Sequence, residues 1–377
     1  MKKILVLILI LVPFFAGAQE RYFEDSQSKI QKVEVLEIIK EEKSSENQKD
    51  VQQFLKVQKE NGEIIQNVLN DLVKVSPGTS VYINEVVDEE SAVKTYYVEE
   101  VFRLNKIIWL FVFFMAFYLL IAGKKGLRSL VALAISVFAV WLILIPALAK
   151  GYDALTVGVL VSSLILFFAI FITHKISVVS FASFLGSLIS VLISTFLAYF
   201  SIYFLNISVF GLEFSSQMLE LYPEMNLQNL LIATIIIGIV GILDDVAVMQ
   251  AILVREFMLE DKNKSVKEVF KKAMKVGQEH TAALVNTIVL AYTAVALPMF
   301  LIIFSPNYKE QIQAGLEIDG GMIYSNEFFI VEIARSVVGS FGLILTVPLV
   351  TIISILIYKK YPPKKEGGAK HSCAHTH

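Results

Sequence analysis

The stretch GIVGILDDVAVM, residues 238–249, places two adjacent aspartates, Asp244 and Asp245, inside an apolar run that extends over residues 230–254. A run of this length is enough for one helix to cross the hydrocarbon of a bilayer, which takes about 20 residues. The composition agrees, because 55% of the 377 residues are hydrophobic and only 18% are charged. The two carboxylates therefore have to be explained inside a membrane.

Six further apolar runs accompany this one, so the sequence predicts an all-α polytopic membrane protein with about seven transmembrane helices in residues 106–360. Each run is near or above the length that a spanning helix needs. Only helices satisfy all their own backbone groups without water, which excludes irregular spans. The predicted spans are residues 107–122, 129–148, 154–173, 177–205, 230–254, 281–304 and 331–358.

The residues before the spans divide into two parts. Residues 1–18 have two lysines, a short apolar stretch and small residues in the order of a secretory signal peptide. An uncleaved anchor is the alternative, and either would export the residues after it. Residues 19–105 alternate apolar and polar residues in short stretches separated by turn signals such as Pro77-Gly78. We therefore predict a small exported, extracytoplasmic β-rich domain of four or five strands.

Lysine and arginine are distributed unevenly between the predicted loops. If residues 19–106 lie outside, the inner loops and the tail carry sixteen of these residues, and the outer loops carry only Lys150 and Lys309. This bias predicts an N-terminal domain outside and a C-terminus in the cytoplasm. Residues 265–275 on the inner side fit a capping box and an amphipathic helix lying on the inner leaflet. The net charge of −2 suggests no nucleic-acid partner, and the lipid bilayer is the expected one.

Asp245 lies at mid-membrane depth. Ten residues separate it from Arg255, which is ~15 Å of helix and about half of the hydrocarbon thickness. A carboxylate at a helix centre costs about 2.5–3.5 kcal/mol on insertion scales, so it needs a neutral form or a polar partner. Gly238 and Gly241 share its helical face, and we expect a glycine-lined seam where another helix approaches closely. Asp244 lies further round the helix and is the second candidate.

Polar residues in the last two predicted spans are the candidate partners. We expect spans five, six and seven to pack together, with Asp245, Asn286 and Thr346 around a polar pocket for a small solute or ion. As alternatives, Asn286 and Thr293 could be interhelical hydrogen-bonding groups, and Arg335 could reach the outer surface with Glu332 as its ion-pair partner. The candidates in these spans are Asn286, Thr293, Glu332, Arg335 and Thr346, with Gly339 and Gly342 as packing glycines.

Three segments carry a family resemblance: GILDDVA at 241–247, NTIVLAY at 286–292 and VGSFGLILTVP at 338–348. Together they resemble the YibE/F-like family of bacterial multi-pass membrane proteins. The resemblance implies seven or eight helices in the bacterial cytoplasmic membrane and an exported N-terminal domain. It also selects Asp245 rather than Asp244 as the shared carboxylate. It implies no established activity or substrate.

The C-terminal tail, residues 361–377, is expected to be flexible and cytoplasmic. It contains His371, Cys373, His375 and His377. Closely spaced histidine and cysteine are typical ligands of Zn, Cu or Ni. A flexible end offers no supporting interactions for such ligands, so a simple solvated tail is the alternative.

Two functions fit these features. The first is a transporter or permease that uses Asp245 as a proton or cation site. The second is a non-catalytic assembly or sensor protein that binds an extracytoplasmic partner through its β-domain. An enzyme is not expected, because the chain has no serine-hydrolase elbow or zinc-protease motif and no second mid-membrane aspartate on another helix. No cofactor is expected either.

Overall fold

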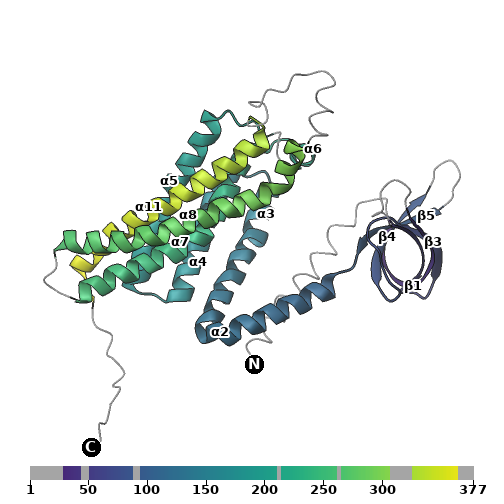
Figure 1. The fold of residues 1–377 in the computed structure, drawn as a ribbon, viewed down its shortest axis with the longest axis horizontal. Coiled ribbons are helices and arrows are strands. Elements are labelled where there is room, and N and C mark those ends of the chain that lie inside the picture. The colour runs from purple at the N-terminus through teal and green to yellow at the C-terminus, as the bar shows by residue number, and fades with distance from the viewer. Residues whose placement is uncertain are drawn as a thin grey trace, which may run out of the picture. The chain divides into compact units, whose positions relative to one another are not determined.

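The chain forms two compact units in the computed structural model (Figure 1). One unit is Met1–Ile121 and the other is Ala122–His377. The predicted signal peptide, residues 1–18, lies outside the described part of the chain. The described residues are 29–43, 51–87, 94–209, 214–260, 265–305 and 325–363.

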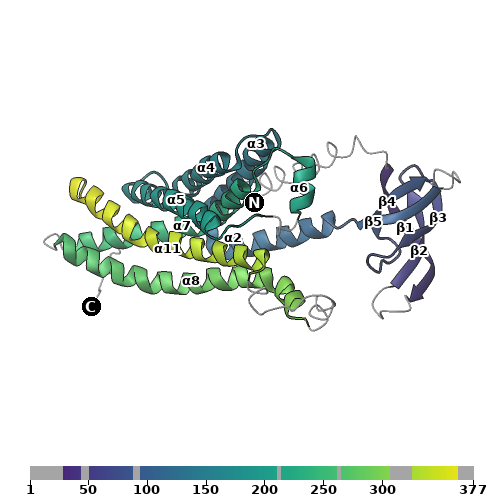
Figure 2. The ribbon, with the colours of Figure 1, turned by 90° about the horizontal axis from the view of Figure 1, so that it is seen from above.

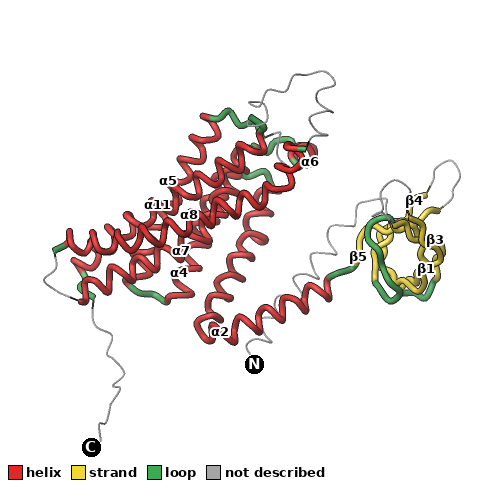
Figure 3. The backbone as a smooth tube through the Cα atoms, in the orientation of Figure 1, coloured by secondary structure: helices red, strands yellow, loops and turns green. Residues whose placement is uncertain are grey.

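In the described part of the first unit, five strands close into a barrel in the order β1-β2-β3-β5-β4 (Figure 3). β1 pairs with both β2 and β4, and β3 pairs with β5 in parallel while the other pairs are antiparallel. This strand order is that of the OB-type Greek-key barrel. It confirms the small N-terminal β-domain. The strands are β1 Lys29–Lys43, β2 Val51–Lys59, β3 Ile64–Asn70, β4 Ser80–Val87 and β5 Lys94–Val101.

The alternation seen in the sequence fills the barrel. Val33 and Val35 on β1, and Leu55 and Val57 on β2, are buried at every second position. Successive side chains of a strand point to opposite faces, so the polar residues between them point outward. The barrel core contains Val33, Val35, Leu55, Val57, Ile65, Val68, Val75, Val81, Ile83 and Val98.

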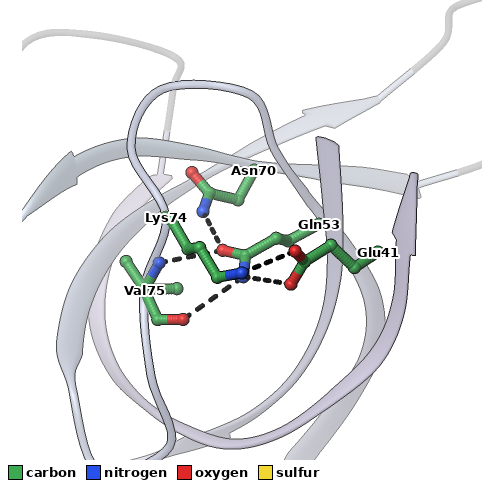
Figure 4. A network of polar contacts seen from close by, with 5 residues as sticks. All are labelled: Glu41, Gln53, Asn70, Lys74 and Val75. Carbon is green, nitrogen blue, oxygen red and sulfur yellow. Dashed lines mark hydrogen bonds and ion pairs between the residues drawn. The ribbon is translucent and has the colours of Figure 1, made fainter. Parts of the chain in front are cut away.

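A polar network holds the loop between β3 and β4 against strand β2 (Figure 4). The Val75 amide donates to Oε1 of Gln53 at 2.9 Å, and Nε2 of Gln53 donates to the Val75 carbonyl at 3.3 Å. Nδ2 of Asn70 donates to the same Gln53 oxygen at 3.0 Å, and an ion pair of 2.6 Å joins Lys74 to Glu41 beside it. Gln53 and Asn70 are fully buried, and their hydrogen bonds explain how the barrel tolerates them.

Within the described residues, seven helices are long and apolar enough to cross a membrane, which confirms the predicted fold class. α2 contains the first span and part of the second, and Gly123 with a φ of 56° breaks it between them. Glycine adopts this left-handed conformation without steric penalty. The helices are α2 Leu104–Ala139, the π-helical turn η1 Val140–Leu144, α3 Ile145–Ala149, α4 Ala154–His174, α5 Val178–Phe204, α6 Ser215–Leu221, α7 Leu227–Glu260, α8 Val266–Phe304 and α11 Glu327–Lys360.

In the second unit, α11 packs against α5, α7 and α8, while α7 also packs against α4 and α5 (Figures 1 and 2). Small residues make the close contacts possible. A Cβ atom added at Gly158 of α4 would lie 2.5 Å from Cβ of Ala233 on α7, and one added at Gly186 of α5 would lie 3.0 Å from Cα of Val350 on α11. Such close backbone approach drives helix association in lipid.

Serines line the buried face of α5. Ser183, Ser187, Ser190 and Ser194 recur at helical spacing, and each is almost completely buried. The Ser183 hydroxyl donates to the backbone carbonyl of Ala247 on α7 at 3.2 Å. These side chains are small enough to allow close packing and polar enough to bond across helices.

α8 is longer than the sequence suggested. Its 39 residues correspond to ~58 Å of helix, about twice the hydrocarbon thickness. The capping box is present, because Glu268 N donates to the Ser265 hydroxyl at 3.3 Å and Ser265 N donates to the Glu268 carboxylate at 3.0 Å. The prediction of a separate surface helix over 265–275 is wrong, since this segment continues into the sixth span without a break. No residue between the amphipathic segment and the sixth span interrupts the helix.

A side-chain bond marks the start of α4. The Asp153 carboxylate accepts from the Thr156 backbone amide at 2.9 Å, and this hydrogen bond holds the pKa of Asp153 below its usual value. The same carboxylate accepts from Nδ2 of Asn229 at 2.6 Å. Asp153 therefore fixes the N-terminus of α4 to the start of α7.

We predict that replacing a glycine of α4 and replacing a glycine of α7 by alanine will change the stability of the protein differently. Gly158→Ala should lower the free energy of unfolding by about 1–3 kcal/mol, because its new methyl group overlaps Ala233. Gly241→Ala should change it little or raise it slightly, since alanine favours helix and, among the described residues, no atom outside the adjoining helix backbone lies within 4 Å of the new methyl. Denaturant unfolding of the purified protein, followed by circular dichroism, measures both. Equal losses would contradict the packing.

Candidate functional site

Asp244 and Asp245 lie near the middle of α7, on a side that is only partly covered. Asp245 is exposed and Asp244 is half-buried, and the Asp245 amide donates to the Asp244 carboxylate at 2.9 Å. Exposed positions one turn apart run along this side of the helix. We call them the open stripe of α7, and they are Thr234, Gly238, Gly241, Asp245 and Met249.

The expected glycine-lined seam is present only in part. At Gly238 an added Cβ atom would lie 3.2 Å from the hydroxyl oxygen of Tyr292 on α8. At Gly241, among the described residues, no atom outside the helix backbone lies within 4 Å of such an atom. The expectation of a close helix contact at Gly241 is therefore wrong. Helical periodicity places Gly238, Gly241 and Asp245 on one face, but it does not determine whether that face is covered.

The structure does not bring Asp245, Asn286 and Thr346 into one pocket. Asn286 lines a cavity of about 500 Å³ together with residues of α8 and α11 such as Val285 and Pro348. Neither Asp245 nor Thr346 lines this cavity. Thr346 is completely buried, and its hydroxyl donates to the Gly342 carbonyl of its own helix at 2.8 Å. The three residues were expected at similar depths in the membrane, but their side chains do not line one cavity.

Thr293 does not face a shared site. Its side chain is exposed, and its hydroxyl donates to the Val289 carbonyl of the preceding turn at 2.8 Å. A threonine hydroxyl in a helix commonly satisfies itself in this way. The part of the chain that the structure describes shows no interhelical bond from this hydroxyl.

Glu332 and Arg335 form an ion pair one helical turn apart on α11. Nη1 of Arg335 lies 2.7 Å from Oε1 of Glu332, and the Glu332 side chain is only 5% exposed while that of Arg335 is 23% exposed. Oε2 of Glu332 and Nε of Arg335 are buried and have no hydrogen-bond partner among the described residues. Buried polar atoms without partners are uncommon and destabilising, so this pair has capacity for a further polar group.

Tyr292 lies between this ion pair and the open stripe. Its hydroxyl oxygen approaches Gly238 on α7, and its ring lies 4.0 Å from a Cβ atom added at Gly339, one turn from Arg335. Gly238 and Asp245 are seven residues apart, or ~10 Å along the helix. Polar groups therefore recur from the ion pair to the middle of α7, and we call these the polar series: Asp244, Asp245, Tyr292, Glu332 and Arg335.

The packing glycines of α11 occupy close contacts. A Cβ atom at Gly342 would lie 2.4 Å from the Ser194 hydroxyl oxygen of α5, and one at Gly339 would lie 3.6 Å from both Ile239 and Ile288. Gly339 therefore faces α7 and α8, and Gly342 faces α5 and also Ile239 of α7. Gly342 allows the closer approach, because a side chain there would overlap Ser194.

The sequence analysis missed Gln250. This residue of α7 is only 2% exposed, and its Nε2 donates to the Thr351 hydroxyl at 2.7 Å and to the Ala273 carbonyl at 3.1 Å. It thereby joins α7, α11 and α8. A glutamine inside an apolar span was the available signal, because a polar side chain there requires an interhelical partner.

The metal hypothesis concerns residues that the structure does not describe, because His371, Cys373, His375 and His377 lie beyond residue 363. Within the described ranges, no group of three or more His, Cys, Asp or Glu residues is arranged to hold a metal ion. The metal-binding hypothesis for the tail stays a prediction.

The length and apolar composition of the seven helices found among the described residues are those of a multi-pass integral membrane protein. The pattern of YibE/F-like proteins matches residues 110–360, which extend from the first span to the end of α11. The chain belongs to the YibE/F-like family, as its motifs indicated. No curated protein and no solved structure matches the chain.

We predict that the Glu332–Arg335 pair will show strong thermodynamic coupling. Arg335→Gln should lower the free energy of unfolding by about 3–5 kcal/mol, because it leaves the Glu332 carboxylate buried and unpaired. The double variant Glu332→Gln/Arg335→Gln should lose less, since it removes both charges. A double-mutant cycle on the purified protein measures the difference. Strictly additive losses would mean that the two side chains do not interact.

Proposed function

We propose that this protein is a transporter or permease in which Asp245, with Asp244 beside it, binds a proton or small cation during passage across the membrane. The supporting observation is an exposed carboxylate in the middle of a membrane helix. Asp245 lies 18 residues from Leu227 and 15 from Glu260, the ends of α7, or ~27 Å and ~22 Å along the helix axis. Charged groups at this depth usually serve ions, protons or substrates.

The surroundings of Asp245 favour contact with water or an ion over a structural role. A structural carboxylate is normally paired in the bundle interior, yet Asp245 is exposed, and beside it Gly241 leaves open space. The opposite side of α7 is tightly packed, with Leu243, Val246 and Ala247 buried. The helix thus presents its carboxylates on the side that the described residues leave open.

The other members of the polar series, which are Tyr292, Glu332 and Arg335, extend from this side of α7 toward the start of α11. Tyr292 provides a hydroxyl above Gly238, and Glu332 has one carboxylate oxygen without a partner among the described residues. Hydroxyl and carboxylate oxygens suit both proton transfer and the coordination of hard cations. A proton or cation leaving Asp245 in this direction would therefore meet further oxygen ligands.

The proposed setting is the bacterial cytoplasmic membrane, with the barrel outside and the C-terminus in the cytoplasm. The bias of sixteen Lys and Arg residues against two supports this orientation. In that orientation α7 runs inward, and Glu332 and Arg335 lie toward the outer side. The polar series then connects the outer half of the membrane with its centre.

A second candidate function is membrane assembly or sensing through an extracytoplasmic partner. Apolar side chains are exposed on the barrel unit, and OB-type barrels carry binding surfaces on strands β2 and β3 and adjoining loops. The open stripe of α7 also has the small residues that suit a partner helix. The exposed apolar residues of the barrel unit include Leu36, Ile39, Ile64, Leu72 and Val73.

Flux measurements on reconstituted protein test the transport proposal. In liposomes with an imposed pH or cation gradient, Asp245→Asn should reduce flux at least tenfold, because it removes the charge that binds the solute. Glu279→Gln, which neutralises an exposed carboxylate of α8, is the matched control and should transport normally. Normal flux through a well-folded Asp245→Asn variant would reject the proposal.

Removal of the barrel separates the two candidate functions. If the helices carry the solute, a variant without residues 29–101 should retain most of the flux, because the polar series lies outside this segment. If the protein acts through an extracytoplasmic partner, the same deletion abolishes its cellular activity while Asp245→Asn lowers only its stability. The deletion and the point variant are therefore compared in one set of liposome and cell assays.

A further inference from the structure

A second cavity lies at the other end of the helices from the Glu332–Arg335 pair. It has a volume of about 590 Å³ and twelve lining residues, which come from four parts of the chain. These parts are the end of α4, the start of α5, the last turns of α7 and the end of α11. The volume is within the range of small-molecule sites in proteins. It shares no lining residue with the cavity beside Asn286.

The charges that line this cavity are positive. They are Lys175, which directly follows α4, and Arg255 of α7; the imidazole of His174, the last residue of α4, lines the cavity beside them. None of the twelve lining residues is acidic, although the Glu256 carboxylate lies 3.9 Å from Arg255. Basic side chains that converge from separate elements on one hollow are suited to an anion.

The N-terminus of α5 adds to this positive potential. Ser177 caps the helix, and its hydroxyl accepts from the Ser180 amide at 3.1 Å. The next two residues, Val178 and Val179, also line the cavity. Amides of the first helical turn have no partner within the helix, and the helix dipole makes this end attractive to anions.

A buried hydroxyl in the wall supplies an independent observation. Tyr358 lines the cavity and is only 2% exposed, and its hydroxyl has no hydrogen-bond partner among the described residues. Tyr358 belongs to a buried apolar cluster with Val254 and Ile355, which holds its ring in the wall. A fixed tyrosine hydroxyl without a partner is ready to donate to a ligand oxygen.

We propose that this cavity binds a phosphate-bearing anion, and that the anion is the headgroup of an anionic phospholipid. The remaining wall favours the lipid over free phosphate, because Ile176, Ile252 and Pro362 are apolar and suit the glycerol and the first acyl carbons. Basic pockets between membrane helices on the cytoplasmic side bind lipid headgroups in this way. The proposal does not depend on the transport function.

Lipid titration of the purified, delipidated full-length protein tests the proposal. Phosphatidylglycerol added to the detergent micelles should raise the Tm more than phosphatidylcholine does, because only the former carries a net negative charge. Lys175→Gln should weaken phosphatidylglycerol binding roughly tenfold. Tyr358→Phe should weaken it roughly threefold while leaving the lipid-free Tm unchanged, since its hydroxyl has no partner to lose.

Lys267→Gln is the matched control. It removes the same charge from the exposed part of α8 near the same end of the bundle, outside the cavity, and should bind phosphatidylglycerol as the wild type does. Inorganic phosphate separates the two sources of the anion. Failure of millimolar phosphate to displace the lipid supports a headgroup site, and displacement assigns the cavity to free phosphate. Equal binding of the two lipids by the wild type, or equal losses in Lys175→Gln and Lys267→Gln, overturns the proposal.

Discussion

Close backbone approach between helices is the constraint on which the bundle depends. Hydrocarbon offers two apolar helices no hydrophobic reason to associate, so contact and interhelical hydrogen bonds have to hold them together. Gly158 against Ala233, and Gly186 against Val350, bring α4 to α7 and α5 to α11 at distances that no larger residue permits. The buried serines of α5 fit the same constraint. The result is a closely packed scaffold of α4, α5, α7 and α11.

That scaffold leaves one side of α7 uncovered, and this side carries Asp245. A helix fixed tightly along one face can hold a carboxylate at mid-membrane depth on the other without distorting, because the packed face supplies the stability. α8 approaches this side at Tyr292 and leaves Gly241 open. The same arrangement that secures α7 therefore makes its acidic pair accessible.

Much of the fold could be predicted because length and periodicity are local properties. The seven spans, the β-domain and the depth of Asp245 follow from apolar run lengths, alternation and the helical rise. The pocket of Asp245, Asn286 and Thr346 was wrong, because depth says nothing of the direction in which each side chain points across a helix interface. Gln250 could have been found, since it is polar in an apolar span, whereas Tyr292 becomes notable only once its contact with Gly238 is known.

Among the three helices around the polar series, α8 has the smallest buried share. In its most apolar stretch 17% of the residues are buried, against 61% for α7 and 50% for α11. Two polar contacts also hold α8 against α7. Nε2 of Gln250 on α7 donates to the Ala273 carbonyl of α8, and the Tyr292 hydroxyl of α8 lies over Gly238 of α7. Between these two contacts, Ile288 of α8 packs in an apolar cluster with Val246 of α7 and with Leu343 and Val347 of α11. α8 is therefore secured to α7 and α11 by polar contacts and by an apolar cluster, although most of its apolar stretch is not buried.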